Sequence, residues 1–506
     1  MKNEKLVGLE ELQKIVSDLK SDGKKIVQCH GVFDLLHVGH IRHFKAARKF
    51  GDVLIVTVTP DKYVNKGPHR PAFPEKLRAE VLASLGVVDY VAVNKWQTAV
   101  ETIKLLKPNV YVKGSDYSNA DEDFSKGITA EEKAIKAVGG EIKFTDEITF
   151  SSSNLINKHL HVFPKETEDY LDEFSKKFTS KQVIDYLEKI KNLKILVIGE
   201  AIIDEYQYGQ TIGKAGKEPI VALKYIETER FAGGTLAIAN HLANFCDNVG
   251  LFTLLGEKDS QADFINKHLN KKVKKYFHYK KNAPTIIKRR FLEAAPLKKL
   301  LEFYVFDDME LEPAQARELC GHLEKILHEY DLVIVADFGH GMLNKDLINL
   351  ISRKAKFLAV NTQSNAGNMG YNIITKYPRI DYVCTDEREI RLASLDKNSA
   401  LEALIKNLSK KISCGKIITT TGPLGCIIFS SNGLVKIPAF SEIVIDTMGA
   451  GDAFLSITAP LVATGVPMEI IGFVGNAVGA LKVKIIGNKE PIDKVALYKY
   501  ITSLMA

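Results

Sequence analysis

The stretch Cys-His-Gly-Val-Phe-Asp-Leu-Leu-His-Val-Gly-His occupies residues 29–40 and joins a short apolar run to a helical pattern. A strand that leads through such a turn into a helix is typical of α/β folds. Gly39 lets the backbone come close to a ligand, and the helix N-terminus offers free N–H groups to phosphate. His37 and His40 bracket this glycine, so both could reach one triphosphate and stabilise the charge that builds up on its α-phosphate and on leaving pyrophosphate.

Two other interpretations of this histidine pair stay open on the residues alone. One histidine could be buried and hydrogen-bonded in the core while the other is exposed. The second is a zinc site, although two histidines at this spacing without a cysteine or carboxylate partner make a poor one.

Short apolar runs and helical patterns alternate through the first 160 residues. This alternation predicts a parallel sheet with helices on both faces, whose ligands bind beyond the carboxyl ends of the strands. We expect strands at residues 25–29, 53–59, 90–93, 110–113 and 141–144, and helices at residues 41–50, 75–85, 99–106 and 131–138.

A charged, amphipathic stretch at residues 163–192 predicts a helical linker that packs on a domain. From Lys194 strands and helices alternate again, which predicts a second α/β domain. The expected domain limits are therefore 1–162, 163–192 and 193–506. In the last of these we expect strands at residues 195–198, 251–255, 332–336, 357–360, 382–384 and 417–420, and helices at residues 233–245, 449–461 and 471–482.

A second chemical motif, Asp-Thr-Met-Gly-Ala-Gly-Asp at residues 446–452, opens a late apolar helix. Gly449, Ala450 and Gly451 place consecutive N–H groups at the helix start, which predicts an anion hole for a transferring phosphoryl group. Asp452 follows on the first turn, where a carboxylate can take a proton from a substrate hydroxyl that attacks a γ-phosphate. An ordinary N-cap aspartate after a glycine turn is the structural alternative.

Composition and charge disfavour several classes of protein. The 506 residues, 45% apolar and 26% charged, predict two to four globular domains. A net charge of +7 suits anionic small substrates, without the concentrated basic stripe of a nucleic-acid binder. The six cysteines form no C-x-x-C pair and the charged N-terminus has no signal-peptide pattern, so a cytoplasmic location is expected. The nearly uncharged stretch 453–481 predicts two buried helices rather than a membrane span.

The motif at residues 29–40 resembles the H-x-G-H motif of the nucleotidyltransferase superfamily. Three further motifs resemble that family in the same order, namely K-G-P-H-R-P at 66–71, V-K-G-S-D-Y at 112–117 and F-S-S-S-N-L-I at 150–156. The resemblance covers about residues 24–160 and implies a Rossmann-like nucleotidyltransferase domain. V-K-G-S-D-Y is similar to the V-K-G-G-D-Y of heptose-1-phosphate adenylyltransferases, which favours ATP, while CTP stays open.

The same resemblance implies roles for single residues. His37 and His40 would bind the triphosphate and stabilise the transition state, and Asp34 would order the turn. Mg²⁺ would enter on the triphosphate of ATP or CTP rather than in a protein cage. The nucleotide- and phosphate-binding residues implied in this domain are Gly31, Phe33, Asp34, Lys66, Arg78, Lys113, Ser151, Ser152 and Ser153.

The second motif resembles a signature of the ribokinase (PfkB) family, D-T-x-G-A-G-D. Three other stretches are similar to that family's motifs, F-A-G-G at 231–234, T-G-P-L-G at 421–425 and G-E-A-I-I-D at 199–204. The resemblance covers about residues 194–490 and implies a ribokinase-like α/β sugar kinase with Asp452 as its catalytic residue. The implied nucleotide-binding residues are Thr421, Gly422, Gly425, Gly449, Ala450 and Gly451, the sugar-binding residues are Asp204, Gly233, Gly234, Lys288 and Arg290, and the metal organiser is Glu389.

Four positions depart from the pattern of the ribokinase family. Glu200 replaces an aspartate, and Ala237 stands where an asparagine usually touches sugar hydroxyls. Asn361 begins a stretch that replaces D-P/x-K, and Asp386 replaces the asparagine of N-x-x-E. The sequence therefore predicts retained chemistry in an altered sugar pocket.

Together the two domains resemble the bifunctional heptose-7-phosphate kinase / heptose-1-phosphate adenylyltransferase family, with the domain order reversed. We expect transfer of a nucleotidyl group from ATP or CTP to a sugar 1-phosphate, heptose type favoured, and phosphorylation of a sugar or sugar phosphate by ATP. One alternative is a cytidylyltransferase for a polyol or acidic sugar phosphate with a matching kinase, and another is an active transferase with a degenerate, regulatory kinase-like domain. Small-molecule substrates, a separate sugar-bisphosphate phosphatase and a homo-oligomer are implied, with neither nucleic acid nor membrane as a partner.

Overall fold

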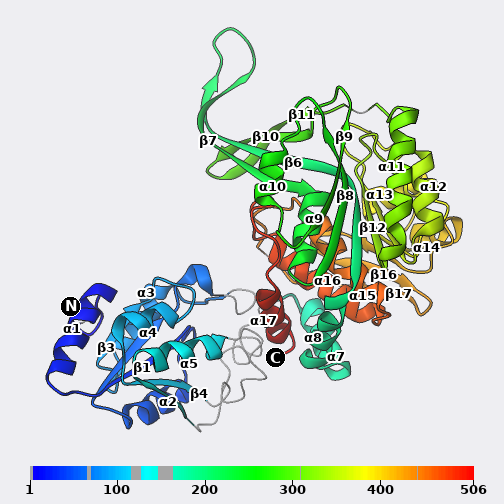
Figure 1. Cartoon of the computed structure of the whole chain (residues 1–506). Coiled ribbons are helices and arrows are strands. Elements are labelled where there is room, and N and C mark those ends of the chain that lie inside the picture. The colour runs from blue at the N-terminus through cyan, green and yellow to red at the C-terminus, as the bar shows by residue number, and fades with distance from the viewer. Residues whose placement is uncertain (1–3, 65–69, 115–126, 146–162, 308, 442) are drawn as a thin grey trace. The chain divides into compact units, whose positions relative to one another are not determined.

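The computed structural model describes residues 4–64, 70–114, 127–145, 163–307, 309–441 and 443–506. The chain divides into two compact units (Figure 1). Unit 1 comprises Met1–Glu168 with Tyr498–Ala506, and unit 2 comprises Asp169–Leu497. The division does not follow the expected domain limits closely, and those limits stay a prediction.

Unit 1 is built on a five-stranded parallel sheet in the order β3-β2-β1-β4-β5. Buried side chains of α2 and α3 pack on one face of this sheet, and those of α1, α4 and α5 pack on the other. The strands are β1 (Ile26–Gly31), β2 (Val53–Val58), β3 (Tyr90–Val93), β4 (Val110–Gly114) and β5 (Glu141–Thr145), and the helices are α1 (Leu9–Ser21), α2 (Val38–Arg48), η1 (Asp61–Tyr63), α3 (Glu75–Ala83), α4 (Val100–Leu106) and α5 (Gly127–Ala137).

The strand order of unit 1 places a topological switch point between β1 and β4. The chain continues from β1 to β2 and β3 on one side, and then returns to β4 on the other. Open α/β sheets bind their ligands at the carboxyl ends of the strands beside such a point. The expected α/β class and all five expected strands are confirmed in this unit.

Unit 2 has one large sheet whose central strand is unusually long. β6 (Lys194–Lys214) pairs through its first residues with β8 (Asn248–Gly256) and β12 (Leu332–Asp337), all parallel. Its later residues pair with β7 (Val221–Gly234) and β10 (Ile286–Ala294). We call β7, β10, β11 (Leu297–Val305) and residues 201–214 of β6 the small sheet, and the rest the main sheet (Figure 1).

Helices cover both faces of the main sheet (Figure 1). A buried apolar cluster joins one face to α11, α12, α13 and α14, and α9, α15 and α16 pack together on the other. The remaining strands are β9 (Lys274–Lys280), β13 (Leu358–Thr362), β14 (Tyr382–Asp386), β15 (Ile417–Thr420), β16 (Cys426–Ser430) and β17 (Gly433–Ile437). The helices are α9 (Thr235–Ala243), α10 (Ala262–His268), α11 (Pro313–Ile326), η5 (Leu327–Glu329), α12 (Lys345–Lys354), η6 (Ile374–Lys376), α13 (Glu387–Ser394), α14 (Leu401–Lys411), η7 (Gly422–Leu424), α15 (Ala450–Ala463) and α16 (Met468–Lys482). The last helix, α17 (Lys494–Leu504), begins in unit 2 and ends in unit 1.

The segment expected to be a helical linker forms α7 (Lys165–Lys177), α8 (Ser180–Lys189) and η4 (Ile190–Asn192). The ring of Phe174 is fully buried and stacks on Phe473 of α16 with 4.2 Å between centroids. The nearly uncharged stretch forms two buried helices, α15 and α16, as expected. Among the described residues, every helix is too short or too polar to cross a bilayer.

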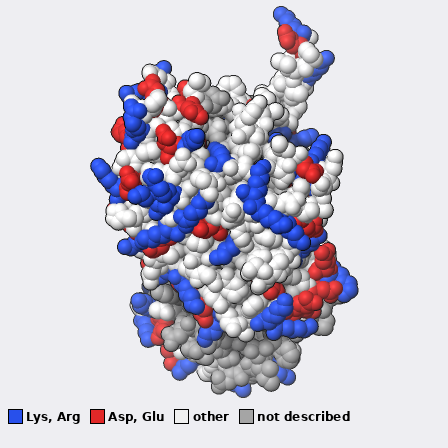
Figure 2. Space-filling view, turned by 90° about the vertical axis from the view of Figure 1, so that its right-hand side faces the viewer, with Lys and Arg blue, Asp and Glu red and all other residues white. Residues whose placement is uncertain are grey.

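Charged side chains are mixed on the face of the molecule that Figure 2 shows. Lys and Arg side chains are spread there among acidic and uncharged residues. The β6–β7 hairpin exposes apolar side chains as well, since Ile212 is 66% and Tyr225 65% exposed. Leu301 and Phe303 of the neighbouring β11 are likewise more than half exposed, so the small sheet carries an apolar surface.

Candidate active sites

His37 and His40 cap the N-terminus of α2 at the carboxyl end of β1. His37 is the N-cap residue, and its Nδ1 accepts a hydrogen bond from the backbone N–H of Gly39 at 3.1 Å. The backbone N–H of His37 in turn points at Nδ1 of His40, at 3.4 Å. The two rings stack with their centroids 4.0 Å apart. This is a capping box made from two histidines, in which hydrogen bonds from nearby backbone N–H groups orient both rings.

The capping bonds also decide where the ring protons lie. Because each Nδ1 accepts a backbone N–H, a neutral ring must carry its proton on Nε2. Burial lowers the pKa of His37, which favours the neutral ring. Nε2 of His37 is buried and has no hydrogen-bond partner among the described residues. The helix N-terminus therefore presents an imidazole N–H donor that is held in place and ready for an anion.

Other expected residues of this site surround the same turn. The Phe33 ring packs against Gly31, where an added Cβ would lie 2.9 Å from the ring. Asp34 is buried, accepts the backbone N–H of Phe73 at 3.1 Å and lies 3.8 Å from the guanidinium of Arg70. These contacts are consistent with the expected role of Asp34 in ordering the turn.

Arg78 and Lys113 approach the site from α3 and β4. The buried guanidinium of Arg78 donates to the carbonyls of Val32 and Thr59 and to Asp61, so in this conformation it braces the loop after β1. Lys113 lies at the end of β4, beside the switch point, and pairs with Glu131 at 3.0 Å. Phosphate binding by both residues stays a prediction. The expected contacts Lys66, Ser151, Ser152 and Ser153 lie outside the described residues.

In unit 2, Asp452 lies on the first turn of α15, directly after the glycine turn. Gly449 is the N-cap residue with φ +73°, a conformation that favours glycine. An added Cβ there would lie 2.2 Å from Oδ1 of Asn488. Burial and the charge of Asp204 raise the pKa of Asp452 to about 7, against the opposing effect of Lys482 and Lys288. A carboxylate with such a pKa is suited to take up a proton near neutral pH.

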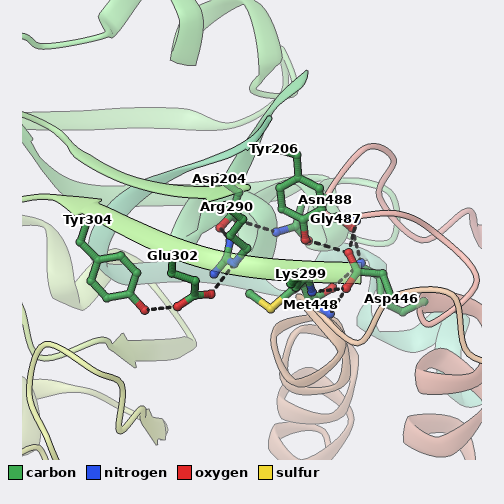
Figure 3. A network of polar contacts seen from close by, with 11 residues as sticks. Asp204, Tyr206, Arg290, Lys299, Glu302, Tyr304, Asp446, Met448, Gly487 and Asn488 are labelled. Atoms are coloured by element: carbon green, nitrogen blue, oxygen red, sulfur yellow. Dashed lines mark hydrogen bonds and ion pairs between the residues drawn. The ribbon is translucent and has the colours of Figure 1, made fainter. Parts of the chain in front are cut away.

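Asp446, the first residue of the motif, is the centre of a buried hydrogen-bond network (Figure 3). Its Oδ2 accepts from the Tyr206 hydroxyl at 2.7 Å and from the backbone N–H of Gly487 at 2.8 Å. Its Oδ1 accepts from Lys299 Nζ at 2.6 Å and from the backbone N–H of Met448 at 3.1 Å. Burial alone would raise the pKa of Asp446, but these hydrogen bonds outweigh it and lower the pKa. Asp446 thereby holds the turn that precedes the anion hole.

Asp204 and Arg290 form a buried ion pair beside this network (Figure 3). Arg290 Nη1 lies 2.6 Å from Asp204 Oδ1, and Asn488 Nδ2 donates to Oδ2 at 3.2 Å. Arg290 Nε donates to Glu302 at 2.6 Å. Gly233 is needed here, because an added Cβ would lie 2.1 Å from Asp204. Asp204 thus lies against two other expected sugar-binding residues, Gly233 and Arg290.

Lys482, at the end of α16, is a buried lysine that the sequence reasoning missed. Its ammonium donates to the carbonyl of Met448 at 2.7 Å and to that of Gly487 at 2.5 Å. Burial lowers its pKa to about 8, although Asp446 and Asp452 oppose the shift. A lysine at the end of a helix that is apolar apart from Glu469 and Asn476 was the signal that could have pointed to it.

The other expected residues of unit 2 are found on loops and strand ends. Gly234 has φ +54° and precedes α9, and Lys288 is buried on β10. Thr421 and Gly425 close a short turn through a 2.8 Å backbone hydrogen bond, with Gly422 between them. An added Cβ at Gly425 would lie 2.0 Å from the carbonyl of Ile437. Nucleotide binding by this turn stays a prediction.

Glu389 takes part in a capping box at the start of α13. It accepts from the Thr385 hydroxyl at 2.7 Å and from the backbone N–H groups of Asp386 and Ser364, each at 3.1 Å. Burial and the charge of Asp386 raise its pKa to about 7. Among the described residues, no cluster of three or more His, Cys, Asp or Glu side chains could hold a metal. The expected metal role of Glu389 therefore rests on a nucleotide supplying the other ligands.

Three of the four positions that depart from the ribokinase pattern, namely Glu200, Asn361 and Asp386, have hydrogen-bond partners of their own. Glu200 is buried and accepts the backbone N–H groups of Phe338 and His340, each at 3.1 Å. The amide of Asn361 donates to the carbonyl of Cys384 at 2.8 Å, and Asp386 is the N-cap residue of α13. Glu200 therefore holds the loop after β12 at the carboxyl end of the main sheet.

Comparison with known proteins assigns a different family to each of two parts of the chain. The model of the pfkB family carbohydrate kinases matches residues 192–494, and the cytidylyltransferase-like model matches residues 29–159. Bifunctional protein HldE of Aliarcobacter butzleri (strain RM4018) is 44% identical over 140 residues, which cover 27% of this chain and 29% of the relative. Bifunctional protein HldE of Geobacter metallireducens is 36% identical over 168 residues, or 32% of each chain. The matched part spans about a third of the length of these relatives.

A crystal structure from Agrobacterium tumefaciens, described as a candidate ribokinase, superimposes with a TM-score of 0.50 at 14% identity. The match covers 61% of this chain and 97% of that one, and at this identity it supports the fold alone. The order of the two family matches is the order expected from the motifs. The chain therefore belongs to the pfkB family of carbohydrate kinases through residues 192–494, preceded by a cytidylyltransferase-like domain.

Proposed function

We propose that this protein is a bifunctional enzyme of nucleotide-activated sugar synthesis, with a kinase site at Asp452 and a nucleotidyltransferase site at His37 and His40. The observation that carries the kinase is the position of Asp452, on the first turn of a helix that begins with a glycine turn. The observation that carries the transferase is the backbone fixation of both histidines at the N-terminus of α2.

The kinase step is a direct phosphoryl transfer. Asp452 accepts the proton of a sugar hydroxyl as that oxygen bonds to the γ-phosphorus, and the bond from this phosphorus to its bridging oxygen breaks to release ADP. The N–H groups of Gly449, Ala450 and Gly451 stabilise the charge on the transferring group. Asp204 and Arg290 orient the acceptor sugar. Mg²⁺, when bound with the nucleotide near Glu389, neutralises phosphate charge.

The transferase step needs no covalent intermediate. An oxygen of the sugar 1-phosphate bonds to the α-phosphorus of the nucleotide, and the bond to the β-phosphate bridging oxygen breaks to release pyrophosphate. The Nε2–H groups of His37 and His40 donate to the oxygens on which negative charge grows. Lys113, at the end of the neighbouring strand, adds a positive charge beside the switch point.

We propose a heptose-type sugar and ATP as the substrates, cytoplasmic location, and a separate phosphatase that removes a phosphate between the two steps. The relatives named HldE and the V-K-G-S-D-Y motif support this choice. The apolar surface of the small sheet supports a homo-oligomer. CTP with a polyol or acidic sugar phosphate is the second candidate. The intact Asp446 network and Asp452 argue against a degenerate kinase domain.

Two product assays on the full chain test both activities. Pyrophosphate release is measured with ATP or CTP and a panel of sugar 1-phosphates, and ADP release with ATP and a panel of sugars and sugar phosphates. We expect His37→Ala to abolish only the first and Asp452→Asn only the second, so that each variant controls for the folding of the other. Pyrophosphate release with CTP but not with ATP would support the second candidate, a cytidylyltransferase for a polyol or acidic sugar phosphate. No ADP release with any acceptor would support the regulatory domain instead.

A further inference from the structure

The glycine turn before α15 lies against the loop that follows α16 (Figure 3). An added Cβ at Gly449 would lie 2.2 Å from Oδ1 of Asn488, so the two segments are in contact. Asp446 joins them as well, since it accepts the backbone N–H groups of Met448 at 3.1 Å and of Gly487 at 2.8 Å. The geometry of the expected anion hole therefore depends on what holds these two backbone segments together.

Two backbone carbonyls from these segments converge on one buried ammonium. Nζ of Lys482, at the end of α16, lies 2.7 Å from the carbonyl oxygen of Met448 and 2.5 Å from that of Gly487. Lys482 is fully buried. Converging carbonyl oxygens are the ligands with which proteins hold dehydrated monovalent cations. An uncharged side chain here would remove the donor that both oxygens share, which is costly in a protein interior.

The surrounding charges also favour a cation at this point. Asp446 and Asp452 stand on either side of the glycine turn, and both lie within electrostatic reach of Lys482. Burial lowers the pKa of Lys482 to about 8, while the charges of these two residues and of Asp204 oppose the shift. Lys299 acts with burial, as a second positive charge. At pH 7 the side chain is therefore mostly an ammonium, held among carboxyl groups and carbonyl oxygens.

The carbonyl of Met448 belongs to the same peptide group as the N–H of Gly449, the first donor of the expected anion hole. A trans peptide group is planar, so its C=O and N–H point in opposite directions. An ammonium that holds the carbonyl therefore fixes the direction of the Gly449 N–H on the other side. A hydrogen bond from a charged donor also polarises the peptide group, which makes its N–H a stronger donor to phosphate oxygens.

We propose that the ammonium of Lys482 is a built-in monovalent cation that positions the anion hole of the kinase, so that phosphoryl transfer needs no dissolved K⁺ or Na⁺. Lys482 is a positioning residue, because it acts through the peptide group between Met448 and Gly449. The inference rests on the proposed kinase function and adds the group that holds its anion hole. The structural alternative is a lysine that only stabilises the end of α16, as basic residues do in the last turn of a helix.

Steady-state kinetics of ADP release by the full chain give the first test. The best acceptor of the sugar panel is used with the Tris salt of ATP, in choline chloride, potassium chloride or ammonium chloride at one ionic strength. The choline cation is too large for the site. We expect the wild type to have the same kcat in all three salts. Lys482→Ala should lose about a hundredfold in kcat in choline chloride, and K⁺ or ammonium should raise it again at least about tenfold, because the shortened side chain leaves space for a free cation.

Two controls accompany this experiment. Lys482→Met is uncharged like the alanine variant but fills the space, so it should show the same loss without recovery in any salt. Lys411→Ala removes an exposed lysine from the last turn of α14 and should behave as the wild type throughout. The proposal is overturned if the wild type needs K⁺ for activity, or if added cations leave the kcat of Lys482→Ala unchanged, as a purely structural lysine would.

Thermal unfolding in the same salts separates this inference from the proposed kinase function, because it needs no acceptor. A cation that occupies the space in Lys482→Ala binds only the folded state and so stabilises it. We expect ammonium chloride to raise the Tm of Lys482→Ala by about 2 °C relative to choline chloride, and to leave that of Lys482→Met unchanged. Equal shifts in both variants would refute the cation site. If the wild type released no ADP with any acceptor, the kinase function would fail, while a shift confined to Lys482→Ala would still support the site.

Discussion

Replacement of Arg290 by methionine tests the buried ion pair with Asp204. The side chains of Arg290 and Asp204 are 3% and 7% exposed, and their charged atoms lie 2.6 Å apart. Among the described residues, the Asp204 carboxylate in Arg290→Met keeps the 3.2 Å hydrogen bond from Asn488 and the charges of Lys288 and Lys482, but it loses the cation that is hydrogen-bonded to it. Breaking a buried pair from one side costs about 3–5 kcal/mol. The contact of Arg290 with Glu302, whose side chain is 40% exposed, adds about 1 kcal/mol or less.

Urea unfolding of the full chain measures this cost. The single tryptophan, Trp96, belongs to unit 1, so its fluorescence follows that unit, while far-UV circular dichroism follows both. A transition that appears in circular dichroism but not in tryptophan fluorescence is therefore the unfolding of unit 2. We expect Arg290→Met to lower its free energy of unfolding by about 3–5 kcal/mol and to leave the tryptophan transition in place.

Two further variants show whether the unpaired charge is the cause. Arg290→Met combined with Asp204→Asn removes the charge as well, and we expect it to recover more than half of the loss. Arg317→Met is the surface control and should change the free energy by about 0.5 kcal/mol or less. The reasoning is refuted if Arg290→Met costs no more than Arg317→Met, or if the double variant is less stable than Arg290→Met alone.

Three other outcomes follow from the kinase site and its surroundings. The kcat of ADP release should rise with pH through about 7, because Asp452 must lose its proton to act as a base and its pKa is raised to about 7; a flat profile between pH 6 and pH 8 would contradict this role. Gly449→Ala places a Cβ 2.2 Å from Asn488 in a backbone conformation with φ +73°, and it should lower kcat about a hundredfold. The control Gly321→Ala adds a Cβ on an open helix surface and should leave kcat unchanged. Burial and the charge of Asp337 raise the pKa of Glu200 from 4.5 to about 7. The folded state therefore holds a proton that the unfolded state releases, and the free energy of unfolding of unit 2 should fall as pH rises from 4.5 to 7. Glu200→Gln should reduce this dependence on pH.

The sequence predicted the parts of the fold in which local pattern and tertiary burial agree. Central strands of the main sheet, such as β12, are buried on both faces, so they are short apolar runs. The motif at 29–40 stands where a strand leads into a helix, and the motif at 446–452 stands at the start of a helix. The strands of the small sheet were missed, as were β9, β16 and β17 of the main sheet, because some or most of their side chains are exposed or half-buried. β11 reads Leu-Lys-Lys-Leu-Leu-Glu-Phe-Tyr-Val, which has no clear alternation of apolar and polar residues. Helix α1 was missed as well, since charges surround its three buried residues.

Motifs indicated the candidate sites, but not the contacts that support them. Glycine turns and paired histidines have recognisable spacing, so Asp452, His37 and His40 could be named from the chain alone. Tyr206, Lys299 and Asn488 meet Asp446 or Asp204 from positions far away in the sequence, and no local pattern indicates such pairing.

The length of β6 constrains how unit 2 can rearrange around a substrate. One uninterrupted strand of 21 residues belongs to the main sheet at its start and to the small sheet at its end. Tilting of the small sheet must therefore bend or twist a hydrogen-bonded strand instead of turning about a loose connection, so closure stores elastic energy. Gly199 lies on this strand so close to Ala336 that an added Cβ would be 2.0 Å from its carbonyl oxygen. A bound sugar that tilts the small sheet would thus distort the backbone that carries Glu200 and Asp204.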